Sequence, residues 1–157
     1  MRARSVLILP ALFLALSSAA DPIRVLCDEP RDRTWILGTD AVYLHERGIS
    51  TPPRRFALPG WIYLKPPYAR EPDLLVEPGG TVIVSSNIMS RLWRIDADAA
   101  STEELDIALQ PGSDRDFGFS ALEMMGHGAL RATSSTDRSR WQIDLAARSA
   151  SRVGGDD

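Results

Sequence analysis

Leu92-Trp93-Arg94-Ile95-Asp96 and Arg140-Trp141-Gln142-Ile143-Asp144 are two copies of one strand pattern, separated by 48 residues. The likeness extends beyond these stretches, because the same shift superimposes eight identical residues over 28 positions without a gap. Self-similarity at a fixed period of this length is the signature of a repeated supersecondary unit. The sequence therefore predicts a unit used at least twice. Its identical residues in the first copy are Leu74, Gly80, Ser86, Trp93, Ile95, Asp96, Ala99 and Ser101.

Each copy contains four short β-rich runs bounded by turn residues. In 73–109 the first two runs are separated by Pro78-Gly79-Gly80, and in 120–153 Gly126-His127-Gly128 takes the same place. The aspartates that close the third runs, Asp96 and Asp144, are expected to cap turns. The stretch 97–105 also fits the start of a helix at a Ser/Thr cap. Four short strands in about 48 residues is the anatomy of a propeller blade.

The chain ahead of these copies contains an abbreviated version of the same unit. Two β-rich runs on either side of Gly38-Thr39-Asp40 have the layout of a hairpin, and the partial repeat covers about 34–59. Seven prolines then fall within 52–78. Because proline removes a ladder donor, this stretch is expected to be mostly connection, with 61–64 as a short edge strand.

The two copies resemble blades of the bacterial β-propellers of the NHL, YVTN and quinoprotein-like group. In those blades a strand, a glycine turn and a second strand are followed by a strand that reads aromatic-x-Ile/Leu-Asp. The resemblance implies a secreted scaffold whose loops bind ligands or partners, and some such proteins are enzymes. A closed propeller takes at least four blades, and this chain has too few. The expected fold is therefore all-β, with antiparallel propeller-blade-like repeats in an incomplete or open array.

Residues 1–20 have the three parts of a cleavable secretory signal. Arg2 and Arg4 precede an apolar run too short to span a bilayer, and Ser18-Ala19-Ala20 precedes Asp21. We expect cleavage after Ala20 and one periplasmic or secreted domain over 21–157, without a membrane span. Loss of the two arginines takes the net charge from −3 to −5. Such a balance does not favour a nucleic-acid partner, which would call for a basic face.

Cys27 is the only cysteine, so no intramolecular disulfide can form. We expect it to be a small buried hydrophobe in an N-terminal strand. A lipid anchor is disfavoured because Leu26, rather than a small residue, precedes it, and an exposed thiol that pairs with another chain is a further alternative.

The aromatic residues Trp61, Tyr63 and Tyr68 are the candidate ligand-binding residues. They lie in the proline-rich connection, where flat amphipathic rings suit contact with a peptide, another protein segment or a glycan. The alternative is that they cover the end of an open sheet, or that a second copy of the chain covers it and forms a homodimer. Trp35, Trp93 and Trp141 lie in strand-like positions and are expected to pack in the core.

The sequence patterns that would indicate a metal site or a catalytic site are weaker than the repeat pattern. Asp114, Asp116 and Asn87 are the candidate calcium ligands, although Gly118 occupies the fifth place of the loop that begins at Asp114, where a calcium loop needs an oxygen ligand. His127 is expected in an exposed hairpin turn, and no Gly-x-Ser-x-Gly turn supports a hydrolase. We therefore expect a non-catalytic binding or scaffold module with no cofactor. The alternative is an enzyme or redox-partner fragment of a calcium- or quinone-dependent propeller.

Overall fold

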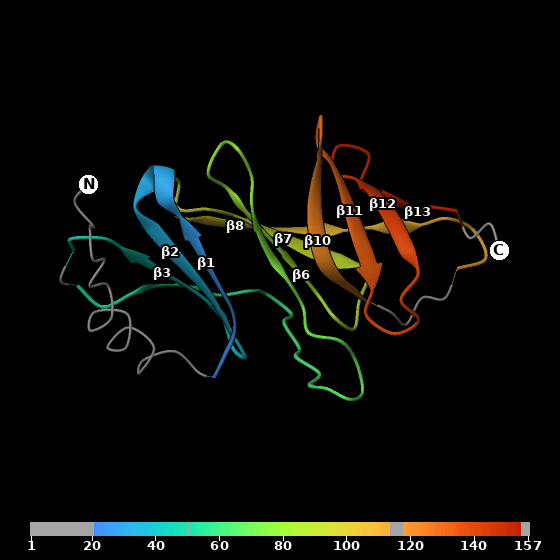
Figure 1. Cartoon of the computed structure of the whole chain (residues 1–157), viewed down its shortest axis with the longest axis horizontal. Coiled ribbons are helices and arrows are strands. Elements are labelled where there is room, and N and C mark those ends of the chain that lie inside the picture. The colour runs from blue at the N-terminus through green and yellow to red at the C-terminus, as the bar shows by residue number, and fades with distance from the viewer. Residues whose placement is uncertain (1–20, 50, 114–117, 155–157) are drawn as a thin grey trace, which may run out of the picture.

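Three predominantly antiparallel sheets follow one another along the long axis of the molecule in this computed structural model (Figure 1). The structure describes residues 21–49, 51–113 and 118–154. Sheet A has the strand order β1-β2-β3-β4, sheet B β5-β6-β7-β8, and sheet C β10-β11-β12-β13-β9. The prediction of an all-β fold in an open array is confirmed. The elements are β1 (Pro22–Asp28), the 3₁₀ turn η1 (Glu29–Arg31), β2 (Arg33–Gly38), β3 (Val42–Glu46), β4 (Arg54–Phe56), β5 (Leu74–Val76), β6 (Val82–Ser85), β7 (Arg91–Asp96), β8 (Ser101–Asp106), β9 (Ala108–Leu109), β10 (Phe119–Gly126), β11 (Ala129–Ser134), β12 (Arg140–Asp144) and β13 (Ser149–Arg152).

The repeat seen in the sequence is a repeat of strand register. In sheet B, Val82 pairs with Ile95 and Val84 with Trp93. In sheet C, the residues 48 positions later form the same pairs, Leu130 with Ile143 and Ala132 with Trp141. The expected capping role of the aspartates is also confirmed, because a carboxylate oxygen of Asp96 accepts the N–H groups of residues 98 and 99 and that of Asp144 accepts the N–H of residue 147.

Sheet B is the centre of the molecule, because both of its faces are buried. Successive side chains of a strand point to opposite faces, so Val82 and Val84 face sheet A whereas Ile83 faces sheet C. Trp93 joins the cluster between sheets A and B, and Trp141 joins the cluster between sheets B and C. The expected core positions of Trp35, Trp93 and Trp141 are therefore confirmed.

The two outer faces of the array differ in character. On sheet C, Arg131 and Gln142 pair on the face turned away from the core and are exposed. A polar face of this kind ends a stack of repeats. On sheet A, the corresponding face carries a small buried cluster of Ile36, Ala41 and Tyr43.

Several local expectations differ from the structure. Residues 61–64 form no strand, and residues 97–105 form a turn followed by β8 rather than a helix. Cys27 lies in β1 as expected, but it is exposed. Cys27 pairs with Thr34 of β2, and the next residue of β2, Trp35, faces the core. Because successive side chains of a strand point to opposite faces, Thr34 and its partner Cys27 lie on the outer face of the sheet.

Two strand pairings join segments that the repeat pattern in the sequence did not connect. β1 adds a strand before the stretch from which the partial first unit was expected, so sheet A has four strands. β9 leaves sheet B and pairs in parallel with β13 of sheet C. Among the described residues, no helix is both long and apolar enough to cross a membrane.

Candidate functional site

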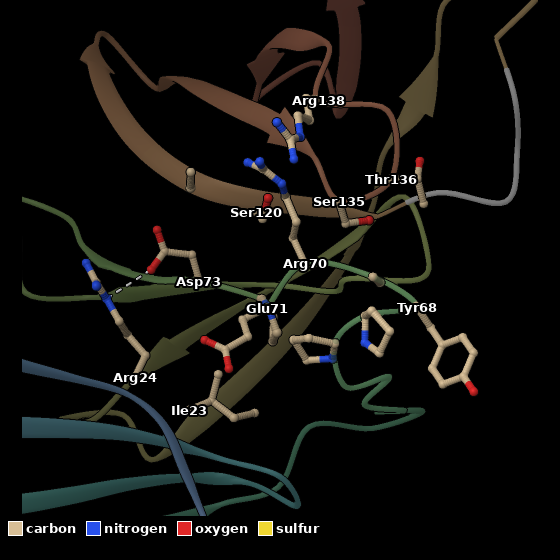
Figure 2. A pocket seen from close by; sticks show the side chains of 15 residues that line it. Ile23, Arg24, Tyr68, Arg70, Glu71, Asp73, Ser120, Ser135, Thr136 and Arg138 are labelled. Atoms are coloured by element: carbon tan, nitrogen blue, oxygen red, sulfur yellow. Dashed lines mark ion pairs between the residues drawn. The ribbon is translucent and has the colours of Figure 1, made fainter.

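An open groove of about 720 Å³ lies where the first strands of the three sheets approach one another (Figure 2). This loop groove is lined by the start of β1, the connection 66–73, the start of β10 and the turn that follows β11. The volume is within the range that accommodates small-molecule ligands. Three arginines and two carboxylates line it, Arg24, Arg70, Arg138, Glu71 and Asp73.

Asp73 ties the three first strands together at the floor of the loop groove. Its carboxylate pairs with Arg24 of β1, with 3.2 Å between Nε and Oδ1. The same Oδ1 accepts the N–H of Leu74 in β5, and Oδ2 accepts the N–H of Leu122 in β10 at 2.9 Å. The Leu122 N–H is free for this bond because β10 bulges between Ser120 and Glu123, with Ala121 at a φ of 48°.

Asn87 fastens the connection 66–73 to sheet B. Its side chain is fully buried, and Nδ2 donates to Leu64 O at 2.5 Å and to Arg70 O at 3.0 Å. The turn after β11 holds the same connection from the other side, because Arg70 N–H donates to Ser135 O at 2.9 Å. The wall of the loop groove is thus fixed to two sheets by buried polar contacts, which makes it a preformed surface.

The three candidate aromatic residues have different environments. Trp61 packs edge-on against Trp93 with ring centroids 5.3 Å apart, and its Nε1–H donates to Thr39 O, so it closes the junction of sheets A and B. Tyr63 is half-buried, and burial together with nearby Glu71 raises the pKa of its phenol. Tyr68 is 76% exposed and lines the loop groove. Only Tyr68 of the three lies at this site.

Arg70 and Arg138 extend toward one another across the loop groove (Figure 2). Both side chains are exposed, and among the described residues neither guanidinium forms an ion pair or a side-chain hydrogen bond. Arg24 differs from them because it is paired with Asp73. Two cations that face one another repel, and an anion placed between them would be attracted by both.

The turn that carries Arg138 is held by Asp137. Its carboxylate accepts the hydroxyl of Ser139 at 2.6 Å and the N–H of Ser139 at 2.9 Å, while Arg138 adopts a left-handed φ of 66°. The hydroxyl and N–H bonds from Ser139 lower the pKa of Asp137 to about 2. The turn is therefore held most strongly when this carboxylate is ionised.

The remaining candidates do not gather into a site. Asp114 and Asp116 lie outside the described residues, and the Asn87 amide is occupied by the contacts that fasten the connection. Among the described residues, no group of three His, Cys, Asp or Glu side chains could hold a metal ion. His127 lies in the turn between β10 and β11 with a φ of 53° and is exposed, as the glycines around it predict.

Sequence reasoning missed Arg24, Arg70, Asp73 and Arg138. The run Arg138-Ser139-Arg140 is typical of a solvated face, Asp73 was expected only as the first residue of a strand, and Arg70 has no periodicity to mark it. The available signal was that charged residues in a proline-rich connection flank the aromatic Tyr68. Comparison of the chain with protein-family models finds no match, and comparison with curated proteins finds no significant match.

Proposed function

We propose that this protein is a non-catalytic binding module that acts in the periplasm or after secretion, and that the loop groove is its ligand site. The observation that supports this is a preformed groove with an exposed aromatic ring and two arginines that form no ion pair with the part of the chain the structure describes. It is built on a wall that Asn87 and Ser135 fix to two sheets. Rigid placement of loop residues on a sheet scaffold lowers the entropy cost of binding. The propeller-like repeat of the sheets is consistent with such a scaffold.

The test is binding without turnover. The mature chain 21–157 is immobilised and probed with defined peptide and oligosaccharide collections, and bound ligands are recovered after prolonged incubation and weighed by mass spectrometry. We expect ligands to be recovered unchanged, and Tyr68→Ala to reduce their retention. Product formation that depends on groove residues would instead establish an enzyme, and retention that is indifferent to Tyr68→Ala would place the site elsewhere.

The alternative, a fragment of a calcium- or quinone-dependent propeller, is separated by metal analysis of the purified protein. We expect no stoichiometric calcium and no change in melting temperature on addition of a chelator. A tightly bound calcium ion would support the alternative and raise Asp114 and Asp116 as ligands. Asn87 would join them through Oδ1, which in this structure accepts the N–H of Leu64 at 3.4 Å.

A further inference from the structure

The charge of the loop groove is opposite to that of the whole chain. Three arginines against two carboxylates leave one net positive charge in its lining, whereas the chain carries −3. The pairing of Arg24 with Asp73 consumes one charge of each sign. The positive charge of this lining therefore resides on Arg70 and Arg138, two side chains that extend toward one another, and Glu71 is the remaining carboxylate (Figure 2).

A pair of guanidinium groups favours the binding of oxyanions. Each guanidinium offers donors in a fixed fork, which matches the two oxygens of a carboxylate or the oxygens of a phosphate ester. Since neither arginine pairs with a carboxylate of the described residues, the carboxylate in the groove lining that would compete with a ligand oxyanion for these two groups is Glu71.

The wall of the loop groove disfavours a peptide strand as the ligand. Strand addition needs a row of free backbone donors and acceptors. Pro66, Pro67 and Pro72 have no N–H, while the N–H and C=O of Arg70 and of Asp73 are used in bonds within the protein. Recognition along this wall therefore depends mainly on side chains, and the most exposed large hydrophobic side chain there is the flat ring of Tyr68. An aromatic ring that lines the same groove as two arginines suits a pyranose ring that carries an oxyanion.

We propose that the loop groove binds an anionic oligosaccharide, with Arg70 and Arg138 holding its oxyanion and Tyr68 contacting a neighbouring sugar ring. This deepens the proposed binding function and rests on it. The oxyanion has two possible chemical sources, the carboxylate of a uronic acid and a phosphate ester on a sugar, and both would use the same two arginines.

Calorimetric titration of the mature chain tests this with four probes: a galacturonate trimer, phosphorylated maltotriose, neutral maltotriose and pentaglutamate. We expect at least one acidic saccharide to bind at least tenfold more tightly than maltotriose, and the better of the two identifies the oxyanion. Raising the salt from 50 to 500 mM should weaken that binding, because exposed charges are screened.

Matched variants then locate the contact. Arg70→Gln and Arg138→Gln should each weaken binding of the acidic saccharide about tenfold, and Tyr68→Ala by a similar factor. Arg140→Gln removes the same charge two residues from Arg138 but outside the groove lining, and it should bind like the unmodified protein. Circular dichroism and melting temperature verify that each variant folds, which is expected because neither Arg70 nor Arg138 holds the fold through an ion pair with a described residue.

Three outcomes would overturn the proposal. The first is equal binding of maltotriose and the acidic saccharides, and the second is a loss of affinity in Arg140→Gln as large as in Arg138→Gln. The third is arginine-dependent binding of pentaglutamate without binding of any saccharide. That last result would retain the binding function and replace the ligand class by acidic peptides, whereas retention of no ligand in the wider screen would remove the binding function itself.

Discussion

Single polar residues join the elements of this molecule at the loop groove. Asp73 connects β1, β5 and β10 through one carboxylate, and Asn87 connects sheet B with the proline-rich connection through one amide. Each is buried or nearly so, and a buried polar group is worth most when all of its partners are present. The shape of the groove therefore depends on a few side chains that are not themselves proposed to contact the ligand.

Asn87→Ala should lower the free energy of unfolding by about 2–3 kcal/mol, because it leaves the carbonyl oxygens of Leu64 and Arg70 without the amide that donates to them. Urea unfolding followed by far-UV circular dichroism measures the change. Gln142→Ala, an exposed substitution on sheet C, is the control and should stay within about 0.5 kcal/mol of the unmodified protein. Equal stabilities of the two variants would show that the connection is not fastened by Asn87.

Stability should fall as the pH is lowered from about 5 toward 2, in part through Asp137. Its pKa in the folded protein, about 2, is below the ordinary value of 3.8. A depressed pKa contributes stability that is present above the unfolded pKa and is lost as the pH falls through the folded pKa. Asp137→Asn should thus differ most from the unmodified protein at pH 6 and converge with it near pH 2 in urea unfolding. A difference that does not depend on pH would contradict this assignment.

At the scale of elements, close backbone contact between sheets B and C replaces side-chain packing at one point. Gly118 leads into β10, and Phe119 N–H donates to Ser86 O at 2.7 Å. A Cβ at Gly118 would fall far inside van der Waals contact with the backbone of residues 86–88. A glycine is therefore required here by space rather than by its own dihedral angles, and the start of β10 is fixed against the turn that contains Asn87.

Gly118→Ala should destabilise the protein by about 3 kcal/mol, because the turn at 86–88 consists of backbone and can move aside only by shifting β6 or β7. Gly79→Ala is the matched control, since a Cβ at Gly79 has no heavy atom within 4 Å and its φ is not in the left-handed region. Thermal unfolding compares the two variants. Equal melting temperatures would mean that the contact at Gly118 relaxes without cost.

At the scale of the whole molecule, the three sheets share two clusters of apolar side chains, and sheet B contributes to both. Neither sheet A nor sheet C covers both faces of sheet B alone. The residues of β6 and β7 are buried, apart from half-buried Arg91, Arg94 and Asp96. Loss of either outer sheet would therefore expose one apolar face of these two strands. The stability of each sheet is therefore coupled to its neighbours by the hydrophobic effect.

We expect residues 21–157 to unfold in a single cooperative transition. Its tryptophans, Trp35, Trp61, Trp93 and Trp141, report on all three sheets and the connection, so urea curves from tryptophan fluorescence and far-UV circular dichroism should coincide. Leu92→Ala, a fully buried change in the cluster between sheets B and C, should shift both curves together by about 2–5 kcal/mol. Two separated transitions would show that the sheets unfold independently.

The sequence by itself determined the local structure of the repeats. Alternation of apolar residues, glycine turns and the closing aspartates are local signals with period 2, so the strands of the two copies and the core positions of Trp93 and Trp141 could be predicted from them. The prediction that 61–64 forms a strand was wrong, because Trp61 turns to Trp93 and the backbone pairs with no strand.

Only the tertiary structure decided how the candidate site is assembled. Arg24, Arg70 and Arg138 lie on three different segments, and no pattern in the sequence places them together. They meet because sheets A and C pack on opposite faces of sheet B, which brings the starts of β1 and β10 to the same end of β5. One cause of that arrangement is the burial of apolar faces, and because the hydrophobic effect has no preferred direction, it leaves no local signal in the sequence. The other is the carboxylate of Asp73, whose three partners become neighbours only in the folded chain.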